Sequence, residues 1–362
     1  MSVALAVRPP STGPKDIDSI VSNSIDPIVR KIDQDGLYPE DPLRELGVSG
    51  AFSRHASQAP STGLPAAVAD MATISESCMS TGFCTWCQDA LVWYLAASEN
   101  TGLQERLLDQ VAGGEQLGGT GLSNPMKSFS SIETLALKGK KVAGGYKVTG
   151  RLPWVSNIGP GHIFAAIFEL PDSRRVMAVV DADAEGVKLS RSSEFIALEG
   201  TGTYTVLFKD AFISESDVIA ENAAEFVPKI RQGFVLLQFG MGLGLARGVA
   251  KSMVKQVASA KNAQWLPLTP DAIFDRVFTL ETKVAELAAS AADTGRGAFL
   301  NVLRARLQVA ELAMSAAQAG ALQAGAGGYI VGSEPNRRQR EALFMGILTP
   351  SVKHITMELA RG

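Results

Sequence analysis

Residues 143–157 read Ala-Gly-Gly-Tyr-Lys-Val-Thr-Gly-Arg-Leu-Pro-Trp-Val-Ser-Asn, and this stretch is the strongest guide to the fold. Gly144-Gly145 forms a turn pair between two runs that alternate as strands do, 134–142 and 146–152. Trp154 and Ser156 are two residues apart, so on a strand they point to the same face. An indole and a hydroxyl on one face suit a flat aromatic ring with a polar edge. The stretch therefore predicts a hairpin whose second strand carries a ring-binding face.

The composition is that of a globular protein. The chain has 362 residues, with 46% hydrophobic and 20% charged side chains, which is enough for two or three packed layers. A net charge of -3 with both signs mixed along the chain argues against nucleic acid as a main partner. The longest nearly apolar run, 234–246, is shorter than the ~20 residues of a membrane span and is expected to be a core helix. The N-terminus lacks a signal-peptide pattern, so we expect a cytoplasmic protein with no membrane association.

The three cysteines, Cys78, Cys84 and Cys87, do not predict a disulfide framework. Cys84 and Cys87 form a CxxC pair, but a zinc site needs a second pair and a thioredoxin-like site needs a preceding strand. The segment reads as helix on both sides. We expect small buried residues one helical turn apart, and no metal site.

Three zones follow one another along the chain. Residues 1–116 are expected to form an N-terminal helical domain, 117–218 a middle β domain, and 219–362 a C-terminal helical bundle. The expected helices are 17–32, 43–46, 66–95, 104–112, 226–260, 270–296, 298–324 and 337–345. The expected strands include 163–168, 176–180 and 204–208.

Glycines recur every four residues at Gly240, Gly244 and Gly248 and so line one face of the expected helix. A glycine inside a helix costs ~1 kcal/mol relative to alanine. Close approach of a second helix along this face would compensate for that cost.

The 143–157 stretch resembles a motif of the acyl-CoA dehydrogenase superfamily of flavoenzymes, in which a Gly-Gly-Tyr hairpin leads into Trp-x-Ser/Thr-Asn. The resemblance covers nearly the whole chain and implies an α+β fold in three parts. These are an N-terminal α-helical domain, a middle β-barrel-like domain and a C-terminal four-helix bundle. It also implies FAD as the cofactor.

Four segments carry the resemblance in the expected order. Residues 119–125 resemble the first flavin segment, where Leu122 and Ser123 would meet the pyrimidine edge of the ring. Trp154 and Ser156 would lie against the flavin, with Ser156 donating toward N5. Residues 200–218 resemble the last strand of the β domain.

The fourth segment contains residues 323–329 and Arg340-Glu341-Ala342, which resemble a glycine loop and the helix start that follows it. In the family this loop approaches the flavin of a neighbouring subunit. Gly325 and Gly328 are therefore candidate cofactor contacts, or else a helix C-cap turn. Ser351, at the end of the following loop, is a further candidate for cofactor binding.

The usual catalytic base is missing from both of its positions. Acyl-CoA dehydrogenases use a Glu to remove the α-proton of the thioester, and this slot holds Thr349 here. Other members carry the base near the position of Phe234, where 234–246 contains no carboxylate. The sequence thus leaves the catalytic group unknown, with Thr349 and His354 as candidates.

A sister group in the superfamily consists of two-component flavin monooxygenases, which take reduced flavin from a separate reductase. They commonly place His before Asp-Pro in the C-terminal loop, where this chain has Met345 and Leu348 before Thr349-Pro350. His354 follows one helical turn later. The Arg-x-x-Phe-Gly element that grips FAD is replaced by residues 262–267, so FMN is an alternative cofactor.

Further candidates come from the helix that often lines the substrate cavity in this superfamily. Trp86 and Gln88 would contact substrate, with a core helix as the equal alternative. His354 is more often a solvated or core histidine than a catalytic one, and His55 and His162 are expected to be structural.

The resemblance predicts a flavin-dependent oxidoreductase of the acyl-CoA dehydrogenase type that acts on an acyl-CoA or similar small organic substrate. One alternative is a two-component, reduced-flavin-dependent monooxygenase, and another is a non-catalytic family member. The resemblance implies a homotetramer and a flavin reductase or electron-transfer protein as a partner.

Overall fold

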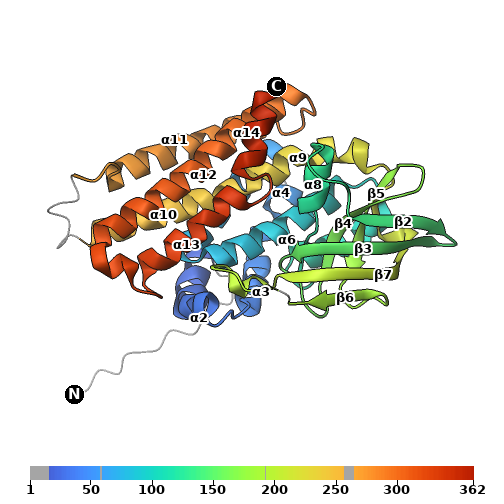
Figure 1. Cartoon of the computed structure of the whole chain (residues 1–362), viewed down its shortest axis with the longest axis horizontal. Coiled ribbons are helices and arrows are strands. Elements are labelled where there is room, and N and C mark those ends of the chain that lie inside the picture. Colours follow the sequence, from blue (N-terminus) through green and yellow to red (C-terminus); the bar gives the residue numbers. More distant parts are fainter. Residues whose placement is uncertain (1–15, 58, 192, 257–264) are drawn as a thin grey trace, which may run out of the picture.

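Figure 1 shows the computed structural model, which describes residues 16–57, 59–191, 193–256 and 265–362. A β-sheet forms one end of the molecule and a bundle of long helices forms the other. Helix α6 (Met79–Ala97) runs between the two, beside the N-terminal helices. The predicted three-part α+β class is confirmed.

The N-terminal part is helical. Its α-helices are α1 (Ile17–Ile20), α2 (Val29–Gln34), α3 (Glu40–Val48), α4 (Arg54–Ser57), α5 (Pro60–Ser77), α6 and α7 (Thr101–Ala112). The single helix expected over 66–95 is divided, because Cys78 has extended backbone angles (φ -139°, ψ 109°). The chain turns there, and α6 takes a new direction through the core with nearly all of its side chains buried.

The middle part is one eight-stranded sheet with the order β6-β7-β3-β2-β4-β5-β8, and β1 pairs in parallel with β4. The strands are β1 (Gly118–Thr120), β2 (Leu137–Val142), β3 (Gly145–Val155), β4 (Ile163–Glu169), β5 (Arg175–Asp181), β6 (Val187–Ser190), β7 (Tyr204–Ser214) and β8 (Val218–Ala220). The predicted hairpin is present, since Val142 pairs with Gly145 across a two-residue turn in which Gly144 has φ +75°. A short helix that the sequence pattern did not predict, α8 (Ser123–Phe129), follows β1.

Strand β4 separates two hydrophobic cores. Ile163, Ala165 and Ile167 face the core made with the helices. Phe164 and Phe168 face a second core, which the inner faces of the strands enclose. The strand is therefore buried on both faces, which explains why its sequence is a continuous apolar run and does not alternate.

The C-terminal part consists of α9 (Ala223–Leu237), α10 (Phe239–Lys255), α11 (Pro270–Ala289), α12 (Arg296–Ala324), α13 (Glu334–Ile347) and α14 (Val352–Ala360). Gln238 separates α9 from α10, where one helix was expected, and 257–260 of that prediction lie outside the described residues. The stretch Ala223–Lys255 is long and apolar enough to cross a membrane, but 94% of its most apolar window is buried inside the protein. This burial makes it a core element of the fold.

The glycine face of α10 packs on α5, as its spacing predicts. A Cβ added at Gly244 would lie 2.1 Å from the carbonyl oxygen of Ala72, and one at Gly240 would lie 2.7 Å from that of Val68. The two helix backbones are in contact because these positions have no side chain.

Candidate functional site

A cavity of about 390 Å³ lies where the sheet meets α6 and α13. This volume is within the ~300–1,000 Å³ usual for small-molecule sites. The lining comes from all three parts of the chain. Its apolar members include Phe83, Trp86, Trp154, Phe195, Phe234, Leu343, Phe344, Ile347 and Leu348. Its polar members include Thr120, Ser123, Lys127, Ser156, Thr201, Thr203, Arg340 and Thr349.

One wall is the end of β3. Trp154 and Ser156 both line the cavity, so the two-residue spacing brings them to one face. Ser156 lies just beyond β3 and forms an isolated bridge with Thr120 at the end of β1. Trp154 is 55% exposed, which leaves a large aromatic surface open on this wall.

Hydroxyl groups gather along the same side. Ser156 Oγ lies 2.7 Å from Thr203 Oγ1, and Thr203 Oγ1 lies 2.9 Å from Thr201 Oγ1. Ser123 Oγ lies 2.9 Å from Thr349 Oγ1, so the first predicted flavin segment meets the loop after α13. The wall therefore offers polar atoms in two groups beside the exposed indole.

Another wall of the cavity is aromatic. The rings of Phe83 and Trp86 are stacked, with centroids 5.6 Å apart, and Phe344 meets Phe83 edge-on at 4.7 Å. The Trp86 indole N–H donates to the backbone oxygen of Phe234 at 3.2 Å, so it is satisfied inside the protein. This wall offers an apolar surface to a ligand.

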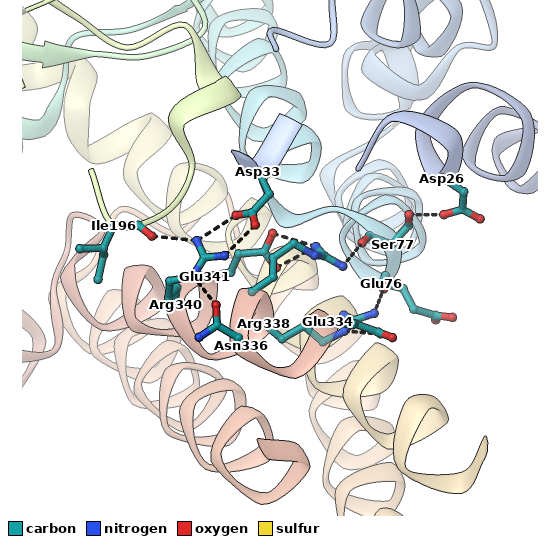
Figure 2. A network of polar contacts seen from close by, with 11 residues as sticks. Asp26, Asp33, Glu76, Ser77, Ile196, Glu334, Asn336, Arg338, Arg340 and Glu341 are labelled. Atoms are coloured by element: carbon teal, nitrogen blue, oxygen red, sulfur yellow. Dashed lines mark hydrogen bonds and ion pairs between the residues drawn. The ribbon is translucent and has the colours of Figure 1, made fainter. Parts of the chain in front are cut away.

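Helix α13 is held in place by arginines that reach the N-terminal helices (Figure 2). Arg340 makes a two-pronged contact with Asp33, at 2.9 and 2.6 Å, and donates to the backbone oxygen of Ile196 at 2.8 Å. Arg338 donates to the backbone oxygen of Glu76 at 2.8 Å. These bonds fix the cavity-lining face of α13 against α2 and against the loop that carries Ile196.

Comparison with known proteins gives the fold. No protein-family model matches the chain. The structure superposes on butyryl-CoA dehydrogenase from Megasphaera elsdenii with a TM-score of 0.82 and 13% identity, over 100% of this chain and 99% of that one. The chain has the acyl-CoA dehydrogenase fold.

Sequence comparison also finds acyl-CoA dehydrogenase homologues. Benzylmalonyl-CoA dehydrogenase of Aromatoleum aromaticum is 21% identical over 245 residues, or 66% of this chain. The match spans 65% of that relative, slightly less than two thirds of its length. Another structure with the acyl-CoA dehydrogenase fold is KijD3 in complex with FMN and dTDP-3-amino-2,3,6-trideoxy-4-keto-3-methyl-D-glucose. Its TM-score is 0.76 and its identity 18%, over 97% of this chain and 94% of that one.

The fold brings together five of the eleven site residues that the sequence singled out. Trp86, Ser123, Trp154, Ser156 and Thr349 all line the cavity. The side chain of Leu122 is fully buried in the core made with the helices.

Gln88 lies outside the cavity lining and has a structural role. Its amide nitrogen donates to the backbone oxygens of Val111 and Gln116 at 2.8 and 2.9 Å. Its amide oxygen accepts from the backbone N–H of Gly118 at 2.8 Å. Because both ends of the side chain are engaged, the predicted substrate contact at Gln88 finds no support in this arrangement.

Four candidates in the C-terminal part are also outside the lining, namely Ser351, His354, Gly325 and Gly328. Ser351 caps the N-terminus of α14 by accepting from the backbone N–H of His354. The His354 ring is buried and its Nε2 lies 2.8 Å from Ser130 Oγ. Gly325 ends α12 with φ +58°, and a Cβ at Gly328 would lie 2.7 Å from a backbone oxygen, so both glycines shape a C-cap turn.

The remaining histidines and cysteines are buried. His55 Nε2 lies 3.0 Å from Asp89 Oδ1, and His162 Nδ1 lies 3.3 Å from the backbone oxygen of Asn157. The three cysteines are free thiols. Cys87 reaches the cavity, but burial raises the pKa of its thiol well above the usual value, which keeps it protonated.

The ionisable side chains of the cavity lining are Lys127, Arg340 and Cys87, and the lining contains no carboxylate and no histidine among the described residues. Lys127 Nζ lies 2.9 Å from Glu133 Oε1. The sequence predicted that no general base is present at position 349. The described lining contains no carboxylate or histidine at any other position either.

Several lining residues were not singled out from the sequence. Thr201 and Thr203 fall within a segment that carries the resemblance, but nothing in the pattern marks their side chains as part of the site. Phe83, Phe344 and Ile196 reach the cavity through contacts between segments far apart in the chain. Hydrophobic spacing predicts burial for such residues and does not distinguish a cavity wall from a core.

Proposed function

We propose that this cavity holds a flavin and that the chain is a flavin-dependent oxidoreductase of a small, largely apolar organic substrate. Trp154, Ser156, Ser123 and Thr349 would hold the ring, since an exposed indole beside hydroxyls fits a flat heteroaromatic group with a polar edge. When bound, flavin supplies two-electron redox chemistry and reactivity toward oxygen. The aromatic wall of Phe83, Trp86 and Phe344 would receive the substrate.

The observation that carries the finer assignment is the lack of a carboxylate or histidine in the described lining. Removal of a thioester α-proton needs a poised base within hydrogen-bond reach. Thr349 and Ser123 have hydroxyls that stay protonated, and an arginine such as Arg340 does not give up its proton. Oxygen-dependent monooxygenation with reduced flavin needs no such base, and we propose it as the main reaction type.

Acyl-CoA dehydrogenation is the second candidate. It is favoured by the sequence relatives, among them benzylmalonyl-CoA dehydrogenase. A dehydrogenase would need a base that enters the site from the substrate, from a partner or from a rearranged chain. A non-catalytic role is a third candidate, and a protein that stayed colourless with added flavin would support it.

The decisive experiment uses the purified chain with FAD and, in parallel, FMN. Anaerobic addition of short-chain and aromatic acyl-CoA thioesters should leave the visible absorbance of the oxidised flavin unchanged in a spectrophotometric titration. A separate flavin reductase with NADH and oxygen-18 should then yield a labelled product from an aromatic substrate panel. Bleaching by a thioester would overturn the monooxygenase assignment in favour of the dehydrogenase.

The partners follow from the same proposal. A reduced-flavin enzyme works with a reductase, whereas a dehydrogenase works with an electron-transfer protein. We also propose a homotetramer. Sedimentation velocity of the chain at micromolar concentration tests this assembly directly.

A further inference from the structure

The charged side chains that line the cavity have one sign. They are Lys127 and Arg340, and the lining contains no carboxylate among the described residues. Cys87, the other ionisable group of the lining, is kept protonated by burial and carries no charge. A lining of this kind attracts an anion and disfavours a cation.

Arg340 is already committed to the protein. Its Nε donates to Asn336 Oδ1 at 3.1 Å, and its two terminal nitrogens bind the Asp33 carboxylate at 2.9 and 2.6 Å. Asp33 balances this charge from outside the described lining. Lys127 is therefore the cation that the cavity can offer to a ligand.

Lys127 is held at the cavity by a braced carboxylate. It lies in the last turn of α8, and its Nζ is 2.9 Å from Glu133 Oε1. Asn124 fixes that carboxylate, since its Nδ2 donates to Glu133 Oε2 at 3.1 Å and to the Thr134 oxygen at 3.0 Å. An ammonium group has three N–H donors, so one bond to Glu133 leaves two for a ligand. The Lys127 side chain is 29% exposed and can be reached from the cavity.

Glu133 does not neutralise Lys127 completely, because a second cation shares it. Burial alone would raise the pKa of Glu133, but hydrogen bonds from Lys127 and Asn124 and the charges of Lys127 and Lys353 lower it. Lys353 lies in the first turn of α14, beside α8. One carboxylate thus stands between two ammonium groups, which leaves an excess positive charge at this corner of the cavity.

We infer that the substrate of this site is an organic anion, with an apolar body on the aromatic wall and a carboxylate or phosphate at Lys127. The inference rests on the proposed function, since it names the substrate class of the same cavity. The rings of Phe83, Trp86 and Phe344 would receive the body. The ammonium would make a charge-assisted hydrogen bond to the oxyanion, which makes Lys127 a specificity-determining residue.

The expected preference is measured with a matched pair of probes. Cinnamate and cinnamamide have the same flat body, and one of them carries a charge. A charge-assisted hydrogen bond is worth about tenfold or more in affinity. Isothermal titration calorimetry of the chain loaded with FMN or FAD should therefore give cinnamate a dissociation constant about tenfold or more below that of cinnamamide. Phenyl phosphate is titrated in parallel, and the tighter of the two anions identifies the charged group.

Three variants test the assignment to Lys127. Lys127→Met removes the charge and keeps the length of the side chain, so the preference for cinnamate should fall to near unity. Lys127→Arg keeps the charge and should retain most of the preference. The control is Lys138→Met, because Lys138 also pairs with a glutamate, Glu169 at 3.1 Å, but lies outside the described lining. Exposed pairs of this kind contribute little to stability, so all three variants should fold, as checked by circular dichroism.

The outcomes separate this inference from the proposed function. Equal affinity for cinnamate and cinnamamide in the flavin-loaded chain would overturn the inference and leave the flavin assignment standing. A preference that survives in Lys127→Met would overturn it as well. So would a Lys127→Met variant that binds FMN more weakly but binds lumiflavin, the ring without a phosphate, and cinnamate as the wild type does, since the ammonium would then hold the cofactor. A folded chain that binds neither FMN nor FAD would overturn the proposed function, and the inference with it.

Discussion

Breaking the contact between Arg340 and Asp33 tests whether the network of Figure 2 positions the cavity wall. The Asp33 side chain is 5% exposed and that of Arg340 is 25% exposed, so the pair is largely withdrawn from water. Arg340→Met would leave the Asp33 carboxylate buried without its partner. Loss of one member of a buried pair costs about 3–5 kcal/mol, and the partial exposure of Arg340 places the expected loss near the lower end, ~3 kcal/mol.

Asp33→Asn should lower the free energy of unfolding by less, about 1–2 kcal/mol. The Arg340 guanidinium keeps its bond to the Ile196 oxygen, and water can hydrate the N–H groups that Asp33 no longer pairs. The double variant should cost about 2 kcal/mol less than the sum of the two single losses. Arg340→Lys is a useful intermediate because it keeps the charge and loses the two-pronged geometry.

Urea unfolding of the wild type, the two single variants and the double variant gives this coupling free energy, provided that the four slopes agree. A coupling below ~0.5 kcal/mol is typical of a solvent-exposed ion pair. Such a value would refute the reasoning, because it would mean that the pair has little influence on where α13 and the Ile196 loop lie.

Three other predictions concern packing, pH and the site. Gly244→Ala should lower the free energy of unfolding by about 1–3 kcal/mol through overpacking, because its Cβ would lie 2.1 Å from a backbone oxygen of α5. The control is Gly297→Ala, where a Cβ on α12 would point into open space. This variant should be neutral or stabilising in the same denaturation assay. Burial lowers the pKa of His354 below its usual 6.5, so the unfolded chain binds the proton more readily and stability should fall as the pH drops through 6.5 toward the folded-state pKa. His354→Gln should flatten that part of the profile of unfolding midpoint against pH, and an unchanged profile would contradict the assignment. Ser156→Ala should weaken the binding of reduced flavin about tenfold in a fluorescence or dialysis titration, and equal affinity would show that the hydroxyl is not in contact with the ring.

Local sequence rules were sufficient where neighbouring residues determine the structure. The Gly144 turn sets the β2–β3 hairpin, the two-residue spacing brings Trp154 and Ser156 to one face, and the four-residue spacing of glycines places α10 on α5. Each of these features follows from a backbone period or a turn that the residues themselves impose.

Other features depend on contacts that a local pattern does not contain. The helix expected over 66–95 is apolar throughout, yet it divides at Cys78, where one residue takes an extended conformation. Gln88 lies on the helix that was expected to line the substrate cavity. Its side-chain amide instead forms hydrogen bonds with three backbone groups from other segments. Such partners lie 23 to 30 residues away in the chain, so its role is visible only in the folded protein.

The break between α9 and α10 shows how a buried polar side chain connects the bundle to the cavity. Gln238 donates to the Thr349 backbone oxygen at 2.8 Å and accepts from Arg306 Nε at 2.8 Å. Arg306 is fully buried, and desolvation lowers the pKa of its guanidinium to about 9. Burial of a cation with neutral partners opposes folding, so its presence is best understood through what it positions. Arg306 also donates to the Met345 oxygen at 2.9 Å and so holds the last turn of α13. Through Gln238 it also holds the loop that brings Thr349 to Ser123. The backbone of Thr349, which the sequence analysis aligned with the usual base, is thus held beside the cavity from inside the bundle.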